Sequence, residues 1–109
     1  MWVAKFIGCT ANVCIVTPTK IICANSGDTR SVISRTNGEV EALSIDHKPD
    51  DLIEKTRIEE AGGNVKDGRI CENLNLSRSL GDFQYKQNLK KDYKEQIITC
   101  HPDIKVIDR

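Results

Sequence analysis

The sequence predicts an α+β fold of mainly antiparallel strands with one or two helices. Over residues 11–45, short apolar and β-branched runs alternate with clusters of turn-forming residues, a pattern that is typical of strands joined by tight turns. Residues 51–61 are instead rich in helix-forming residues and are followed by Gly62 and Gly63, which predicts a helix of about three turns. These two observations place the first strands and the main helix in separate parts of the chain.

Four short segments have strand character, and they are residues 11–16, 21–24, 31–34 and 40–45. Pro18 separates the first two, because proline cannot donate to a strand ladder. The turn-forming residues 25–28 separate the second from the third, and Asn37-Gly38 is a strong signal for a two-residue hairpin turn between the last two. None of these connections is long enough for a parallel crossover, so we expect an antiparallel meander.

The predicted helix at residues 51–61 has a recognisable start and one apolar edge. Asp51 with Glu54 three residues later forms a capping-box pattern. The helix carries a thin apolar stripe, which consists of Ile53, Ile58 and Ala61. Such a stripe predicts that one edge of the helix packs on a sheet.

Beyond the helix, the sequence predicts a second hairpin, a loop and two short strands. Residues 64–66 and 69–71 flank Asp67-Gly68, whose residue types suit a two-residue hairpin turn. Residues 87–95 are rich in lysine and have no periodic apolar face, which indicates a solvated loop or flap. The last two strand candidates are residues 97–98 and 104–107.

Composition excludes several classes of partner. The 109 residues are enough for one domain. Sixteen basic and sixteen acidic residues cancel, so no net field draws the chain onto nucleic acid or an anionic membrane. The short apolar runs suit neither a membrane span nor a signal peptide. We expect an intracellular protein, cytoplasmic or nuclear, with no nucleic-acid and no membrane partner.

The cysteines favour the same compartment. They are Cys9, Cys14, Cys23, Cys71 and Cys100. Their number is odd and no two have the Cys-x-x-Cys spacing of a zinc or redox motif. Four of them lie beside or within apolar segments, where a thiol behaves as a small hydrophobic group. A reducing compartment therefore fits them best.

Four motifs occur in a fixed order along the chain. They are residues 8–11 (Gly-Cys-Thr-Ala), 24–30 (Ala-Asn-Ser-Gly-Asp-Thr-Arg), 46–49 (Asp-His-Lys-Pro, followed by Arg57-Ile58 and Ala61-Gly62-Gly63) and 74–86, which contains Ser77-Arg78-Ser79-Leu80-Gly81-Asp82. Each is weakly specific alone, but in this order they define a resemblance that covers about residues 8–107. In this order they resemble the PPM (PP2C) family of metal-dependent protein serine/threonine phosphatases. The resemblance implies an incomplete part of a PP2C-like β-sandwich flanked by helices.

The resemblance also implies a function, the Mg²⁺- or Mn²⁺-dependent dephosphorylation of a phosphoprotein substrate. In this family two divalent metals activate a water for in-line attack on the phosphoryl group. Their ligands come from a glutamate, an Asp-Gly-His segment, an Asp-Gly-Leu-Trp-Asp motif and an Asp-Asn motif. None of those three motifs is present in this sequence.

The absent motifs predict a partial domain. By the family pattern both ends of the chain look cut, so residues 1–109 would be the central segment of a PPM-type phosphatase domain and inactive alone. One apolar sheet face would then be uncovered, and we expect the piece to aggregate or to bind a partner, such as the remainder of a phosphatase domain. The alternative is a non-catalytic, pseudophosphatase-like binding module on the same scaffold.

Asp46 is the candidate metal ligand. It stands where a predicted strand gives way to the turn before the helix, a position that holds a side chain rigidly beside solvent. The resemblance implies that it helps to hold an additional, more weakly bound metal near the dinuclear centre. The alternative is a capping or turn aspartate. No catalytic residue is assigned, and His47 and Lys48 are interpreted as turn and supporting residues.

Other charged residues in the motifs are interpreted as structural. Asp28 and Arg30 alternate with one residue between them, so they could point to the same side of a strand and pair. Arg78 and Asp82 have the spacing of an ion pair on a helix. Asp67 precedes a glycine, as metal-bridging aspartates of the family do, but its neighbours match the hairpin after Ala-Gly-Gly, so we interpret it as a turn residue.

Overall fold

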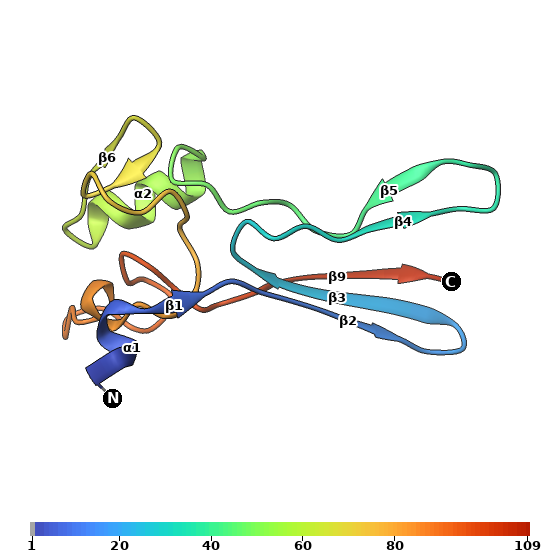
Figure 1. Cartoon of the computed structure of the whole chain (residues 1–109), viewed down its shortest axis with the longest axis horizontal. Coiled ribbons are helices and arrows are strands. Elements are labelled where there is room, and N and C mark those ends of the chain that lie inside the picture. Colours follow the sequence, from blue (N-terminus) through green and yellow to red (C-terminus); the bar gives the residue numbers. More distant parts are fainter. Residues whose placement is uncertain (1) are drawn as a thin grey trace.

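The computed structural model describes residues 2–109, without the side chain of Trp2. Met1, one of the two chain ends that are predicted to be cut, lies outside the described residues. The described chain measures 46 × 30 × 23 Å. Figure 1 shows long strands at one end and short elements with loops at the other.

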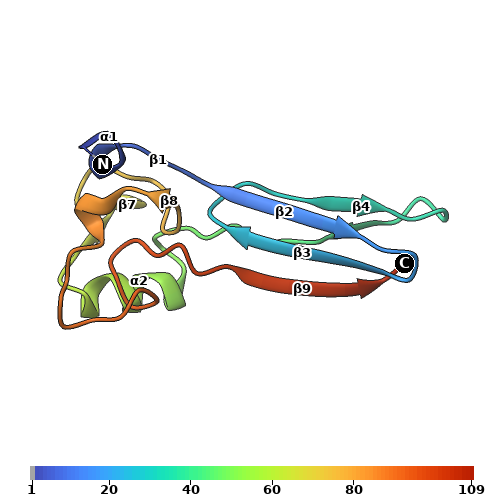
Figure 2. The ribbon, with the colours of Figure 1, turned by 90° about the horizontal axis from the view of Figure 1, so that it is seen from below.

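Three long strands form the central sheet. They are β2 (Ala11–Val16), β3 (Lys20–Ser26) and β9 (Asp103–Asp108). Their order is β2-β3-β9, and both pairs are antiparallel. The sequence predicted β2 and β3 almost to the residue, since both are rich in β-branched residues and a proline-containing turn separates them. The partner of β3 at the other edge comes from the far end of the chain (Figure 2).

A hairpin of β4 (Val32–Ser34) and β5 (Val40–Ala42) forms a separate layer. The turn between its strands contains Gly38 at φ +85°, and the predicted hairpin is confirmed. The predicted two-residue turn is wrong, because Arg35 pairs with Glu39 and leaves three residues in the loop. Ile21, Cys23 and Leu43 form the buried core between the layers, with Ile33 and Ile107 packed against them. The expected single meander is therefore split, because residues 27–31 carry the chain out of the first sheet.

The outer face of the central sheet is apolar and exposed. Register places six side chains on this face: Val13, Ile15, Ile22, Ala24, Ile104 and Val106. The four on the edge strands β2 and β9 are each more than half exposed. The arrangement matches the uncovered apolar sheet face that the sequence predicted.

The helix α2 (Leu52–Glu60) belongs to the second core. Ile58, Ile70 and Ile98 are completely buried there. Of the predicted apolar stripe, Ile58 is buried as expected, but Ile53 is 76 % exposed. The position that faces the interior is taken by Glu54, whose side chain is 3 % exposed.

The capping box predicted at the start of this helix does not form. Asp51 is the N-cap residue, but its side chain makes no capping hydrogen bond. Its carboxylate accepts from the backbone N–H of Lys48 instead. The glutamate of the predicted box, Glu54, is occupied by two arginines.

Short strands and turns complete the fold. They are α1 (Trp2–Phe6), β1 (Gly8–Cys9), β6 (Val65–Lys66), β7 (Arg69–Ile70), β8 (Leu80–Gly81) and the 3₁₀ turn η1 (Phe83–Tyr85). The β6-β7 turn holds Asp67 at φ 52° and Gly68 at φ 72°, as a type I′ hairpin requires. Asp67 is thus a turn residue, as predicted.

Three predictions concern the last part of the chain, and two of them are confirmed. Residues 87–95 form no helix or strand, and β9 includes the predicted strand at residues 104–107. Residues 97–98 are not a strand, because Ile98 is used to fill the second core. Among residues 2–109, no helix has the length and apolar character needed to cross a bilayer.

Candidate functional site

Asp46 lies on the connection between β5 and α2, as the sequence predicted. Its two carboxylate oxygens accept from Nε and Nη2 of Arg30 at 3.1 and 3.0 Å. The aspartate side chain is 20 % exposed and the arginine side chain 64 %. The hydrogen bonds and charge of Arg30 hold the pKa of Asp46 below its usual range. Asp46 is therefore an ionised and partly exposed carboxylate, the kind of group that coordinates metal cations.

His47 fixes the backbone next to this carboxylate. The backbone N–H of Gly27 donates to His47 Nδ1 at 3.0 Å, and the backbone N–H of His47 donates to the carbonyl of Gly27 at 3.0 Å. Because Nδ1 accepts, the ring proton is on Nε2, which lies 2.9 Å from Asp103 Oδ2. The His47 side chain is 5 % exposed, so it is a buried tether and does not face a substrate.

Lys48 makes the second link between the motif at residues 24–30 and the motif at residues 46–49. Its Nζ lies 2.6 Å from Asp28 Oδ2. The predicted pair between Asp28 and Arg30 is wrong, because each of them pairs with the segment of residues 46–48. Strand β3 ends at Ser26, so the alternation that would bring the two side chains together does not reach them.

Replacing Arg30 by methionine is expected to raise the pKa of Asp46 toward its ordinary value, because the largest cause of the lowered pKa is removed. Carboxyl NMR signals followed against pH measure this directly. Lys20→Met is the matched control, since it should raise the pKa of Asp108 instead. An unchanged Asp46 pKa in Arg30→Met would show that the pair does not form in solution.

Asp103, the partner of His47, belongs to a network of charged side chains that is buried at Glu54, Arg57 and Arg78 and exposed at Asp103. The Glu54 carboxylate accepts from Arg57 Nη1 at 2.5 Å and from Arg78 Nη2 at 2.5 Å. Arg78 Nη1 lies 2.9 Å from Asp103 Oδ1, and Asp103 is the partner of His47. The network therefore joins α2, the segment before β8 and the start of β9.

The pair predicted between Arg78 and Asp82 is wrong. Residues 78–82 are not helical, and Asp82 has φ 50°. Its carboxylate accepts from Ser79 Oγ at 2.7 Å. A spacing of four residues brings two side chains together on a helix, and these residues do not form one.

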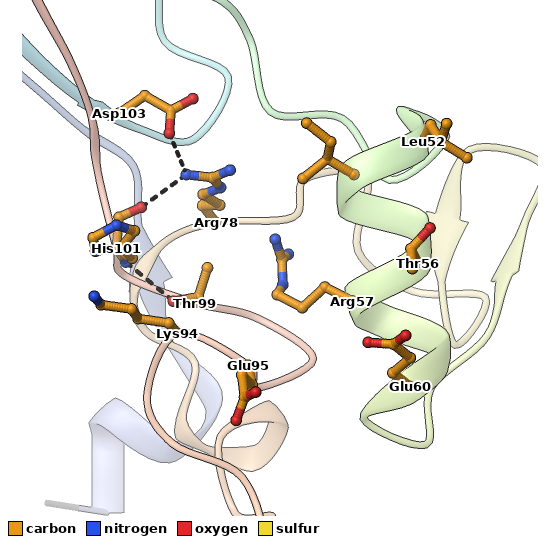
Figure 3. Close-up of a pocket in the computed structure, with 11 residues that line it drawn as sticks. Leu52, Thr56, Arg57, Glu60, Arg78, Lys94, Glu95, Thr99, His101 and Asp103 are labelled. Carbon is orange, nitrogen blue, oxygen red and sulfur yellow. Dashed lines mark hydrogen bonds and ion pairs between the residues drawn. The ribbon is translucent and has the colours of Figure 1, made fainter.

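A cleft of about 480 Å³ opens beside this network. Figure 3 shows Leu52, Thr56 and Glu60 of α2 on one side, facing the segment that carries Lys94, Glu95, Thr99 and His101. Arg57 and Arg78 also line the cleft, and both are already hydrogen-bonded to carboxylates. Arg57 donates in addition to the backbone carbonyls of Ser77, Gln96 and Ile97. Asp46 does not line the cleft.

The described residues do not by themselves fit a divalent metal. Mg²⁺ and Mn²⁺ require about six oxygen ligands. Within residues 2–109, no group of three or more histidine, cysteine, aspartate or glutamate side chains is arranged to hold a metal ion. Asp46 offers one carboxylate, and Arg30 engages both of its oxygens.

The roles of Glu54 and Asp103 were not predicted from the sequence. One signal was available for Glu54, which lies four residues before the buried Ile58 and so on the same helix face. An acid at such a position predicts a buried partner. No comparable signal marks Asp103, since its partners are distant in the sequence.

Comparisons with known proteins agree on one family. The family model described as protein phosphatase 2C matches residues 4–109. "Probable protein phosphatase 2C 4" of Paramecium tetraurelia is 50 % identical over 105 residues, which are 96 % of this chain and 35 % of that protein. "Protein phosphatase ppm-1.G" of Caenorhabditis elegans is 52 % identical over 99 residues, covering 91 % of this chain and 20 % of that one.

Solved structures show the same likeness. A crystal structure of a phosphatase from Toxoplasma gondii has a TM-score of 0.80 and 35 % identity, over 82 % of this chain and 28 % of that one. A structure described as a Caenorhabditis elegans sex determining protein has a TM-score of 0.73 and 31 % identity, over 91 % and 23 %. The chain thus spans about a third or less of the length of these proteins.

Proposed function

Because the chain belongs to the protein phosphatase 2C family, we propose that it is part of a Mg²⁺- or Mn²⁺-dependent protein serine/threonine phosphatase that acts on a phosphoprotein substrate in the cytoplasm or nucleus. Residues 1–109 correspond to a central segment of the phosphatase domain and are inactive alone. The four ordered motifs and the names of the relatives support this proposal.

Asp46 is proposed as the residue through which this segment contributes to the metal centre. The observation that carries the proposal is its placement, an ionised carboxylate on a backbone that Gly27 and His47 clamp from two directions. The exposed Arg30 competes only weakly with a metal ion for this carboxylate, because surface ion pairs contribute little to stability. Since the described residues contain no group of three or more side chains that could hold a metal ion, the remaining ligands belong to other parts of a complete family domain.

The experiment is a domain chimera. The matched third of the Paramecium tetraurelia relative is replaced by this chain, and hydrolysis of a phosphoserine peptide is measured against Mn²⁺ concentration. We expect Mn²⁺-dependent turnover, and an Asp46→Ala version that needs more Mn²⁺ for half-maximal rate. Asp50→Ala is the matched control, since it removes an exposed carboxylate four residues away and should leave the Mn²⁺ requirement unchanged.

The isolated 109-residue chain should not hydrolyse an aryl phosphate, with or without Mn²⁺. A folded chimera without turnover would overturn the phosphatase proposal and favour the non-catalytic binding module. A turnover with equal Mn²⁺ requirements in Asp46→Ala and Asp50→Ala would keep the activity but reject Asp46 as a ligand. Turnover by the isolated chain would reject its assignment as an inactive segment.

A further inference from the structure

Two cysteines lie directly opposite each other in the central sheet. Cys14 of β2 is in register with Cys23 of β3. Both side chains lie on the sheet face that is turned toward the β4-β5 hairpin, where Cys23 is part of the core and Cys14, on the edge strand, stays exposed. Cys14 Sγ lies 3.5 Å from Ser31 Oγ, and Cys23 Sγ lies 3.7 Å from Asn12 Oδ1. Burial and the adjacent Cys14 thiol raise the pKa of Cys23, which is consistent with close contact between the two thiols.

The hydrogen-bond pattern of the hairpin determines how close this pair can come. The backbone N–H of Thr17 donates to the carbonyl of Lys20 at 2.8 Å, so that pair is at a hydrogen-bonded position. Antiparallel pairs alternate between hydrogen-bonded and non-hydrogen-bonded positions. Three pairs further along the register, Cys14 and Cys23 therefore occupy a non-hydrogen-bonded position.

A non-hydrogen-bonded pair has the spacing that a disulfide needs. The Cα atoms of such a pair are about 4.5 Å apart, and the side chains are closer than in the alternate pair. Disulfides span Cα distances of about 4.4 to 6.8 Å. The two sulfurs can therefore be joined without a shift of register.

The two thiols differ in access to solvent. Cys14 is exposed, whereas Cys23 is 1 % exposed. An oxidant in solution reaches Cys14 first, and the buried thiol beside it is then placed to react with the oxidised sulfur. This is the arrangement of a reactive and a resolving cysteine.

We propose that Cys14 and Cys23 are a peroxide-oxidisable pair that forms a cross-strand disulfide. The Cys14 thiolate attacks one oxygen of hydrogen peroxide, the O–O bond breaks, and a sulfenic acid and water form once the leaving hydroxide takes a proton. The Cys23 sulfur then attacks the Cys14 sulfur, the S–O bond breaks, and a second water leaves. In total two thiols and one peroxide give one disulfide and two waters. The proposal does not depend on the phosphatase assignment.

The test is peroxide treatment of the native 109-residue chain, alkylation of the remaining thiols, and tryptic mapping. Cleavage after Lys20 separates the two cysteines, so the disulfide links the peptide of residues 6–20 to that of residues 21–30. We expect this linked pair to be the main disulfide product and to be lost in Cys14→Ser. Cys71→Ser is the matched control, because it removes another exposed thiol and should leave the yield unchanged.

Two further outcomes separate this pair from its alternatives. Cys9 lies in the same peptide as Cys14, so linkage that persists in Cys14→Ser would overturn the proposal. Oxidation of Cys14 to a sulfinic acid, with Cys23 still open to alkylation after unfolding, would also overturn it. Circular dichroism of each variant before treatment establishes that the sheet is intact.

Discussion

Replacing Glu54 by glutamine is expected to lower the free energy of unfolding by about 3 to 5 kcal/mol. The carboxylate is buried and is the shared partner of Arg57 and Arg78. A neutral amide keeps the volume but leaves two largely buried guanidinium groups without their counter-charge, and its N–H₂ group faces donors. Urea unfolding of both proteins, followed by circular dichroism, measures the difference.

This loss should depend on pH. Burial opposes ionisation of Glu54, but the hydrogen bonds and charges of Arg78 and Arg57 outweigh it and lower the pKa below the ordinary 4.5. A carboxyl group with a lowered folded-state pKa stabilises the protein above its unfolded-state pKa, and this contribution is lost as the pH falls through the folded-state pKa. The stabilities of wild type and Glu54→Gln should therefore converge in acid, below about pH 4.5.

Glu59→Gln is the matched control for this experiment. Glu59 lies on the same helix and is exposed, so its replacement should change stability by no more than about 0.5 kcal/mol. If Glu54→Gln costs no more than Glu59→Gln, the buried network does not support the fold.

Elements with local causes were predictable from sequence. Strands β2 and β3 follow from runs of β-branched residues. The Asn37-Gly38 and Asp67-Gly68 turns follow from the left-handed backbone that a tight hairpin requires. In each case the cause lies within a few residues of the element itself, so no tertiary information was needed.

Ion-pair partners were not predictable, because the fold chooses them over long distances. Local spacing suggested that Arg30 pairs with Asp28, yet its partner Asp46 is 16 residues away. Arg78 binds Glu54, 24 residues away. A short arginine-to-acid spacing predicts a pair only when the backbone between them is a regular helix or strand, and in both places it is not.

The position of Asp46 followed from sequence, but the structure behind it did not. The strand-to-helix junction was visible in the residue pattern. The two hydrogen bonds between Gly27 and His47, which we call the clamp, could not be predicted from the sequence, because they join a turn and a histidine 20 residues apart. That clamp is what places the carboxylate, so the glycine has a larger effect on the candidate site than its position in a turn suggests.

Replacing Gly27 by alanine is expected to cost about 3 kcal/mol or more of unfolding free energy. Gly27 has φ +123°, and a Cβ there would lie 2.4 Å from Thr10 Cγ2 and 3.0 Å from the carbonyl oxygen of Arg78. Relief of this overlap must move the turn, and with it both backbone hydrogen bonds to His47. We therefore expect a lower urea midpoint together with altered NMR signals of the His47 ring and the Asp46 carboxyl.

Gly38→Ala separates backbone strain from this loss of the clamp. Gly38 also has a positive φ, +85°, but a Cβ there meets no atom within 4 Å. Its replacement should cost about 1 to 2 kcal/mol, the penalty of a left-handed backbone for an L-residue, and should leave the His47 and Asp46 signals unchanged. Equal losses in the two variants would mean that the close contacts of Gly27 relax freely, and Asp46 would then depend on Arg30 and Lys48 rather than on the clamp for its position.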